Sequence, residues 1–200
     1  MGELTVLAID PGSEKMGVAV VRVGTSRESE EVLYWKQISC GSGILPKRMV
    51  RLTAELGPII GRALAAGATL LAIERPPPVW HTDGGRERRQ DTMYSLGISA
   101  GVAVGLWTAR SIHPWVEVPV DLWRGAYKSR DGWGLNGKEG WKRGAQRLCE
   151  LLWKLQSVPE DAAEAVLLGI FAGRNQLAGG LYSSSVPSGN SLKQKAFAWK

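Results

Sequence analysis

Four acidic residues stand where the surrounding sequence predicts buried structure. Asp10 ends the apolar run LTVLAI, and Glu74 ends the apolar run TLLAI. Asp161 and Glu164 are three residues apart in an alanine-rich segment, so a helix there would place both on one face. If the two apolar runs are neighbouring strands, we expect the four carboxylates to meet at one edge of a sheet.

Carboxylates held this closely repel one another unless a cation neutralises them. Their hard oxygen ligands favour Mg²⁺ or Mn²⁺. Two such ions in one site activate a water molecule and stabilise the departing oxygen during phosphodiester cleavage. The pattern therefore predicts metal-dependent phosphodiester hydrolysis that needs no side-chain nucleophile.

Three of the acids also have an ordinary structural explanation. An aspartate before Pro-Gly, such as Asp10, is a common turn former. Asp161 and Glu164 would interact favourably with the dipole at the start of a helix. Glu74 is harder to explain in this way, because Pro76 follows two residues later and no helix cap requires it. The occurrence of all four acids in this order favours the metal site.

The remaining sequence predicts the elements that position these acids. Strands are expected at residues 4–9, 16–24, 31–38, 69–73 and 115–120. Helices are expected at residues 47–66, 92–110 and 138–155, in a short segment after the last strand, and after a capping box of Ser157 and Glu160. We expect an α/β fold in which a mixed five-stranded sheet, opened by an antiparallel meander, is flanked by helices.

The chain divides into one expected folded domain, residues 1–173, and a C-terminal tail, residues 174–200. The tail is rich in serine and glycine and has four basic but no acidic residues, so we expect it to be basic and flexible. Within the domain, Gly97, Gly101 and Gly105 recur every four residues and would line one face of a helix. Such a face permits close packing on a sheet or on a partner helix.

Composition favours a polyanionic partner. The net charge is +6, and the nine tryptophans offer flat surfaces on which bases stack. The N-terminus lacks a basic segment followed by an apolar core, as a signal peptide would have, and no apolar run reaches the roughly 18 residues of a membrane span. The expectation is a cytoplasmic protein with no membrane association.

Several segments together resemble the RuvC family of Holliday-junction resolvases, within the RNase H-like superfamily. LAIDPGSEKMGVAVV resembles the family's opening strand and hairpin, and LLAIERP its second acidic strand. SLGISAGVAVGL is similar to its glycine-rich helix, and VPVDLWRGAYKSRDGWGLNGKEGWK to its basic DNA-contacting segment. PEDAAEAVLLG is similar to the last helix, where two metal-binding acids sit three apart. The resemblance runs in order from about residue 4 to residue 173.

The resemblance implies an RNase H-like homodimer with two divalent ions, Mg²⁺ or Mn²⁺, in each active site. It implies symmetric cleavage of a four-way DNA junction that leaves 5′-phosphate and 3′-hydroxyl ends. The catalytic metal ligands would be Asp10, Glu74, Asp161 and Glu164, with Asp10 bridging both ions. A protein of this kind acts in the cytoplasm of a bacterium, either as a cellular protein or as a phage protein in its host.

Basic and aromatic residues between the acids are candidates for DNA contact. They are Arg75, Trp80, Arg86, Arg88, Arg89, Arg124, Lys128, Lys138 and Lys142. Arg124 and Lys138 fall near the family's basic positions, although a solvated basic face would explain them equally. The family commonly has an aromatic wedge three positions after the second acid, where this chain has Pro77. Trp80 or His81 would then take that part, unless Trp80 simply packs under its loop.

Other functions compete with junction resolution. An RNase H-like nuclease could act on flaps, hybrids or other branched DNA instead. A non-catalytic junction-binding protein would also need a basic surface, but it would not need four acids. Sugar kinases and actin-type ATPases also open with an acidic strand, but they need two such domains and a much longer chain.

Overall fold

The computed structural model describes residues 2–12, 14–41, 43–75, 90–128 and 137–179. The strands in these residues are β1 (Leu4–Asp10), β2 (Lys15–Val23), β3 (Glu31–Ser39), β4 (Ala68–Arg75) and β5 (Trp115–Pro119). The helices are α1 (Leu45–Ala65), α2 (Gln90–Thr108), α3 (Val120–Lys128), α4 (Gly137–Trp153) and α5 (Glu160–Leu177), with a 3-10 turn, η1, at Arg27–Ser29.

The five strands form one mixed sheet in the order β3-β2-β1-β4-β5. The first three strands pair in an antiparallel meander, whereas β4 and β5 run parallel to β1. The meander confirms the sequence prediction, and the adjacency of β1 and β4 meets the condition under which the four acids were expected to lie together. The parallel pairing matters most, because it places the ends of β1 and β4 at the same edge of the sheet.

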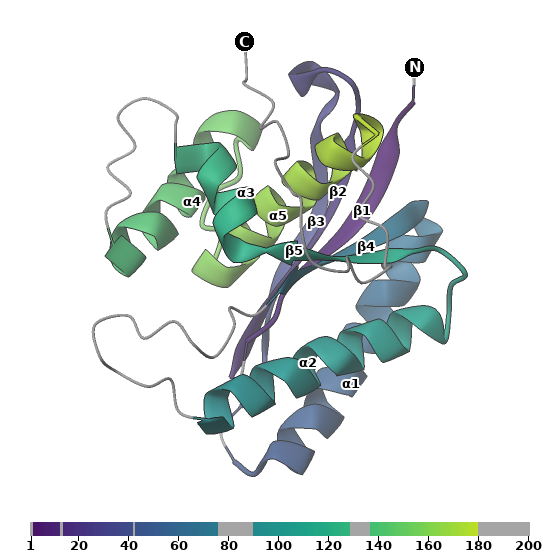
Figure 1. Cartoon of the computed structure of the whole chain (residues 1–200), viewed down its shortest axis with the longest axis vertical. Coiled ribbons are helices and arrows are strands. Elements are labelled where there is room, and N and C mark those ends of the chain that lie inside the picture. The colour runs from purple at the N-terminus through teal and green to yellow at the C-terminus, as the bar shows by residue number, and fades with distance from the viewer. Residues whose placement is uncertain (1, 13, 42, 76–89, 129–136, 180–200) are drawn as a thin grey trace, which may run out of the picture.

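Helices cover both faces of the sheet, as Figure 1 shows: α3, α4 and α5 lie on one face, and α1 and α2 on the other. Alternation along the strands feeds two separate cores. On β1, for example, Ala8 faces the α5 side, while Leu7 and Ile9 face α1 and α2. The strands read as nearly continuous apolar runs because both of their faces are buried.

The glycine-lined face of α2 points away from the sheet. The buried face of the helix consists of Ser95, Ser99, Ala103 and Trp107. Gly97, Gly101 and Gly105 are exposed, and a Cβ atom added at any of them would have nothing within 4 Å. Packing on the sheet, the commoner of the two expected uses, is therefore not what these glycines do.

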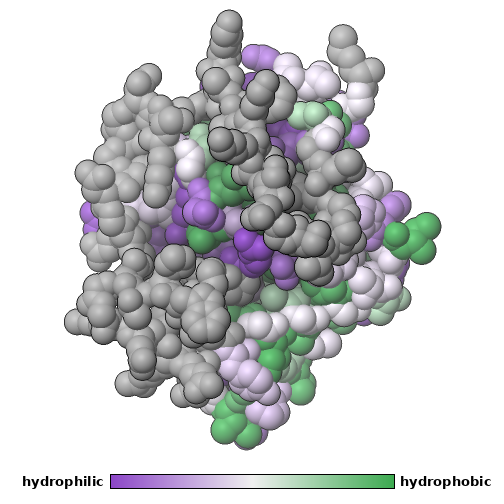
Figure 2. Space-filling model, in the orientation of Figure 1, coloured by the Kyte–Doolittle hydropathy of each residue, from purple (hydrophilic) through white to green (hydrophobic). Residues whose placement is uncertain are grey.

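The α1–α2 side also exposes large apolar side chains. Ile44, Val50 and Tyr94 are each at least 65% exposed. In the space-filling view, hydrophobic surface lies over the lower part of the molecule, where α1 and α2 are found (Figure 2). A helix face that combines glycines with neighbouring apolar side chains suits contact with another apolar surface.

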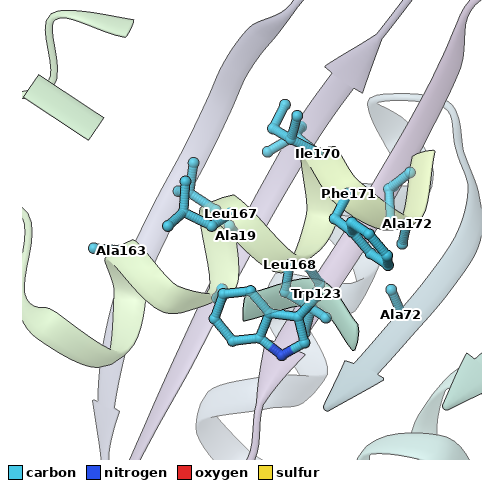
Figure 3. Packing of buried hydrophobic residues seen from close by; sticks show 14 of the residues in the cluster. Ala19, Ala72, Trp123, Ala163, Leu167, Leu168, Ile170, Phe171 and Ala172 are labelled. Atoms are coloured by element: carbon cyan, nitrogen blue, oxygen red, sulfur yellow. The ribbon is translucent and has the colours of Figure 1, made fainter. Parts of the chain in front are cut away.

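Helix α5 lies unusually close to the sheet because both surfaces carry small residues. Ala8 on β1 stands in register with Ala19 on β2 and Ala72 on β4. Over them, Gly169 of α5 approaches so closely that an added Cβ atom would lie 2.9 Å from Ala8 Cβ and 2.9 Å from Val21 Cγ2. Figure 3 shows α5 with Ala19, Ala72 and its own apolar side chains in one hydrophobic cluster.

The predicted start of α5 was wrong by two residues. The expected N-cap, Ser157, has a positive φ of 56°, and Pro159 is the N-cap instead. A capping box at Ser157 would require Val158 to be helical, but a residue that precedes proline disfavours the helical region. The helix therefore begins at Glu160, immediately after the proline, and Asp161 lies in its first turn.

The expected C-terminal boundary of the domain, residue 173, lies within α5, near its end. The helix continues past residue 173 to Leu177, and residues 180–200, which make up most of the expected tail, lie outside the described residues. None of the helices described here combines the length and the apolar character that crossing a bilayer demands.

The close packing of α5 can be tested with a matched pair of glycine substitutions. We expect Gly169→Ala to lower the free energy of unfolding by about 1–3 kcal/mol, the usual cost of overpacking a core. The control Gly61→Ala lies on the exposed face of α1, with nothing within 4 Å of the new Cβ atom. It should raise that free energy by up to about 1 kcal/mol through helix propensity. Equal changes in urea denaturation would contradict the close contact.

Candidate active site

The two strand-end acids lie side by side because β1 and β4 are parallel and in register. Ile9 of β1 pairs with Ile73 of β4, so Asp10 and Glu74 are the next residues on neighbouring strands. Glu74 is 9% exposed, and Asp10 is partly buried at the end of its strand. The apolar strands thus carry both carboxylates to one point at the edge of the sheet.

Helix α5 adds the other two acids at the same point. Asp10, Asp161 and Glu164 each offer a carboxylate oxygen, and these oxygens lie within 4.8 Å of one another. Gly17, which pairs with Asp10 across the hairpin, makes this possible: a Cβ atom there would lie 1.8 Å from the backbone oxygen of Asp161. We call Asp10, Glu74, Asp161 and Glu164 the acidic cluster.

Two cations compensate part of the negative charge. Arg124 of α3 donates from Nη2 to Glu164 Oε1 at 2.6 Å, and the same nitrogen lies 3.7 Å from Glu74 Oε2. Lys142 of α4 donates to Asp161 Oδ1 at 3.1 Å and to Glu160 Oε2 at 2.9 Å. Burial acts to lower the pKa of Lys142, but its bonds to these two acids outweigh that effect and raise the pKa above its usual range.

Three neutral donors among the described residues also contact the cluster. The indole N–H of Trp123 donates to Glu74 Oε2 at 2.9 Å, and that of Trp141 donates to Glu164 Oε1 at 2.6 Å. Gln37 of β3 donates from Nε2 to Asp161 Oδ2 at 2.5 Å. The sequence interpretation missed all three. The one available signal was that both tryptophans directly precede basic residues, in LWR and GWK.

Among the four acids, Asp10 has a strongly raised pKa. Burial raises the pKa of Asp10 well above its usual range, and the charges of Glu74, Glu164 and Asp161 raise it further. Arg124 acts in the opposite direction without cancelling this rise. A divalent cation would relieve the repulsion, and its preferred ligands are the carboxylate oxygens gathered here. The residues present therefore fit a magnesium or manganese site.

The structure places some of the candidate DNA contacts and leaves others outside the described residues. Arg75 is the exposed last residue of β4, beside Glu74. Arg124 and Lys142 lie within the site, where they contact its acids. Lys128 and Lys138 belong to α3 and α4, but their side chains are outside the described part. Also outside it are Pro77, Trp80, His81, Arg86, Arg88 and Arg89.

Comparison with known proteins finds similarity in structure but none in sequence. The chain matches no protein-family model and no curated protein by sequence. A Thermus thermophilus RuvC structure superposes with a TM-score of 0.65 at 18% identity and covers 88% of this chain and 98% of that one. RuvC from the same organism in complex with a Holliday junction substrate gives 0.63 at 17% identity, covering 88% and 97%.

A third solved structure extends the similarity beyond bacteria. The yeast mitochondrial Holliday junction resolvase Ydc2 superposes with a TM-score of 0.53 at 15% identity, covering 87% of this chain and 80% of that one. At these identities the comparisons establish the fold. The chain has the RNase H-like α/β fold that its sequence predicted.

The repulsion at Asp10 has a measurable effect on stability. Folding raises the pKa of Asp10, so the folded protein binds more protons than the unfolded chain and loses stability as the pH rises from the unfolded pKa toward the folded one. Asparagine cannot ionise, so we expect Asp10→Asn to stabilise metal-free protein at neutral pH. A gain of about 1 kcal/mol would raise Tm by roughly 2–4 °C, measured by circular dichroism in EDTA.

The matched control is Glu117→Gln, the same chemical change at an exposed position on β5. At every pH from acid to neutral, the Tm of this variant should equal that of the wild type. Added Mn²⁺ should stabilise the wild type more than Asp10→Asn. If both substitutions shift Tm equally, the carboxylates do not repel one another as the geometry requires.

Proposed function

We propose that the chain is a structure-selective endonuclease that resolves four-way DNA junctions by metal-dependent phosphodiester hydrolysis. The observation that carries the proposal is the acidic cluster, which lies at the sheet edge where β1 and β4 end, in an RNase H-like fold. The similar structures include a RuvC in complex with a Holliday junction substrate. The products would carry 5′-phosphate and 3′-hydroxyl ends, and the reaction would take place in the bacterial cytoplasm.

The four carboxylates of the acidic cluster would hold two Mg²⁺ or Mn²⁺ ions. When bound, such ions activate water for attack on phosphorus and stabilise the departing 3′ oxygen. The chain's part is to hold the four carboxylates in place before substrate arrives. It does so with two strand ends, the first two turns of α5 and the donors that surround them.

The cations beside the acids would receive the DNA. Arg124 and Lys142 balance the carboxylates, and each has donors able to reach a phosphate oxygen. Arg75 adds an exposed positive charge directly after Glu74. Lys128 and Lys138 lie in the same basic segment of the sequence as Arg124 and Lys142, and Arg86, Arg88 and Arg89 lie in the sequence between β4 and α2. With Trp80 as a stacking surface, these residues form the proposed DNA contacts.

A four-way junction has two equivalent strands to cut, so we propose that the enzyme acts as a homodimer. The exposed glycine face of α2 is the proposed contact between the two copies. Its glycines have open space around them, and the neighbouring Tyr94 is 65% exposed. Two copies meeting here would bury apolar surface that a monomer leaves in water.

The catalytic proposal is tested by cleavage of a mobile four-way junction with mapped cut positions. We expect wild-type protein with Mg²⁺ to cut opposite strands symmetrically and to prefer the junction over flaps, forks and RNA–DNA hybrids. Asp10→Asn should abolish cutting, because it removes the negative charge of one of the carboxylates that would hold the ions, and should leave junction affinity nearly intact. Gel-shift assays in Ca²⁺ measure that affinity.

Three results would contradict the proposal. If Asp10→Asn cuts at the wild-type rate, the acidic cluster is not the catalytic metal site. Equal cutting of hybrids and junctions would favour a general RNase H-like nuclease. Binding of the junction without cutting by any divalent ion would favour the non-catalytic alternative.

The dimer is tested with a bulky residue on α2. We expect Gly101→Arg to leave Tm near the wild-type value, because the position is exposed, and to convert a micromolar dimer to a monomer in sedimentation velocity. Gly61→Arg, also exposed on a helix with open space, should remain dimeric. A wild-type monomer in the presence of junction DNA would overturn the dimer.

A further inference from the structure

The two glutamates of the acidic cluster each accept a hydrogen bond from a different buried tryptophan. Trp123 Nε1 lies 2.9 Å from Glu74 Oε2, and Trp141 Nε1 lies 2.6 Å from Glu164 Oε1. The tryptophans are 0% and 4% exposed, so water does not compete for either bond. A hydrogen bond to a charged acceptor of this kind is among the stronger ones in proteins.

The two indoles are held in place by each other and by α5. Their ring centroids lie 5.3 Å apart in an edge-to-face contact. Trp123 also makes an edge contact with Tyr127, whose hydroxyl donates to the backbone oxygen of Leu167 on α5 at 2.9 Å. Packing between the two rings therefore restrains both indoles, and Tyr127 links Trp123 to the helix that carries Glu164.

Indole donors suit carboxylates that must also bind a cation. An indole N–H orients an oxygen without adding positive charge, whereas a lysine in the same place would compete with the ion. Trp141 and Arg124 both donate to Oε1 of Glu164, and no donor in the described part of the chain contacts Oε2. Arg124 in turn lies over both rings, with Cζ 5.2 Å and 5.5 Å from their centroids.

We propose that Trp123 and Trp141 are positioning residues that hold Glu74 and Glu164 in the orientation that binds the divalent ions. The proposal rests on the proposed nuclease function. It assigns a role to two hydrogen bonds: the bond from Trp123 on α3 to Glu74 on β4, and the bond from Trp141 on α4 to Glu164 on α5. Neither indole touches the reacting atoms, and each acts through the carboxylate to which it donates.

The experiment compares three single substitutions of a buried tryptophan by phenylalanine. Trp123→Phe and Trp141→Phe each remove one indole N–H from the site. Trp107→Phe is the control. Trp107 lies in the core between the sheet and helices α1 and α2, and it is also 0% exposed. Its indole N–H donates at 2.9 Å to the backbone oxygen of His113 and not to a carboxylate. Mn²⁺ affinity is measured without DNA, by electron paramagnetic resonance of the free ion.

We expect the two site variants to bind Mn²⁺ roughly 10–100-fold more weakly than wild type, the usual effect of losing a partner of a metal ligand. Trp107→Phe should bind with wild-type affinity despite a similar loss of stability. In junction cleavage, the site variants should require more Mn²⁺ for half-maximal rate and recover most of the rate when it is saturating.

A second variant separates the hydrogen bond from the shape of the ring. Replacement of Trp141 by 3-benzothienylalanine keeps the bicyclic ring and exchanges N–H for sulfur, so it preserves the contact with Trp123 and the core. It should weaken Mn²⁺ binding as Trp141→Phe does, while leaving Tm near wild type.

The outcomes distinguish this inference from the function on which it rests. Wild-type Mn²⁺ affinity in both phenylalanine variants or in the benzothienyl variant would overturn the positioning role while leaving the nuclease intact. An equal loss in Trp107→Phe would also overturn it, because the effect would then come from general destabilisation. A wild-type protein that binds no Mn²⁺ would overturn both proposals.

Discussion

Like charges brought together at the edge of a buried sheet repel one another, and the organisation of this protein follows from that constraint. Burial and the charges of the other three carboxylates raise the pKa of Asp10, and Arg124 does not cancel this rise. Arg124 and Lys142 supply partial compensation. Indole and amide donors also contact Glu74, Glu164 and Asp161. A site held in this way is prepared for a divalent cation before the cation arrives.

The rest of the fold serves to hold the acids close. The three alanines in register on β1, β2 and β4 have short side chains, so α5 can pack close to the sheet there. Gly169 of α5, which has no side chain, allows this close contact. Gly17 does the same for the first turn of that helix, which carries Asp161. Larger side chains at these positions would lift the helix and separate its acids from those of the strands. Small residues in the core are thus needed to bring the carboxylates of the acidic cluster together.

The sequence predicted the sheet well because strands depend on local patterns. Apolar runs mark strands, and a charge that ends such a run stands out, as at Glu74. The capping box at Ser157 failed because proline restricts the residue before it, a constraint that outweighs a cap. The roles of Trp123 and Trp141 were not predictable, because the direction of an indole N–H depends on packing between distant segments.

The order of the cluster along the chain has a consequence for biosynthesis. Asp10 emerges from the ribosome with the first strand, whereas Asp161 and Glu164 emerge with α5, the last helix of the sheet's core. Until that helix is made, Ala8 and Ala19 remain uncovered and the strand acids have no partners from α5. The complete cluster therefore cannot form before α5 has been synthesised, so nascent chains lack it throughout most of their synthesis.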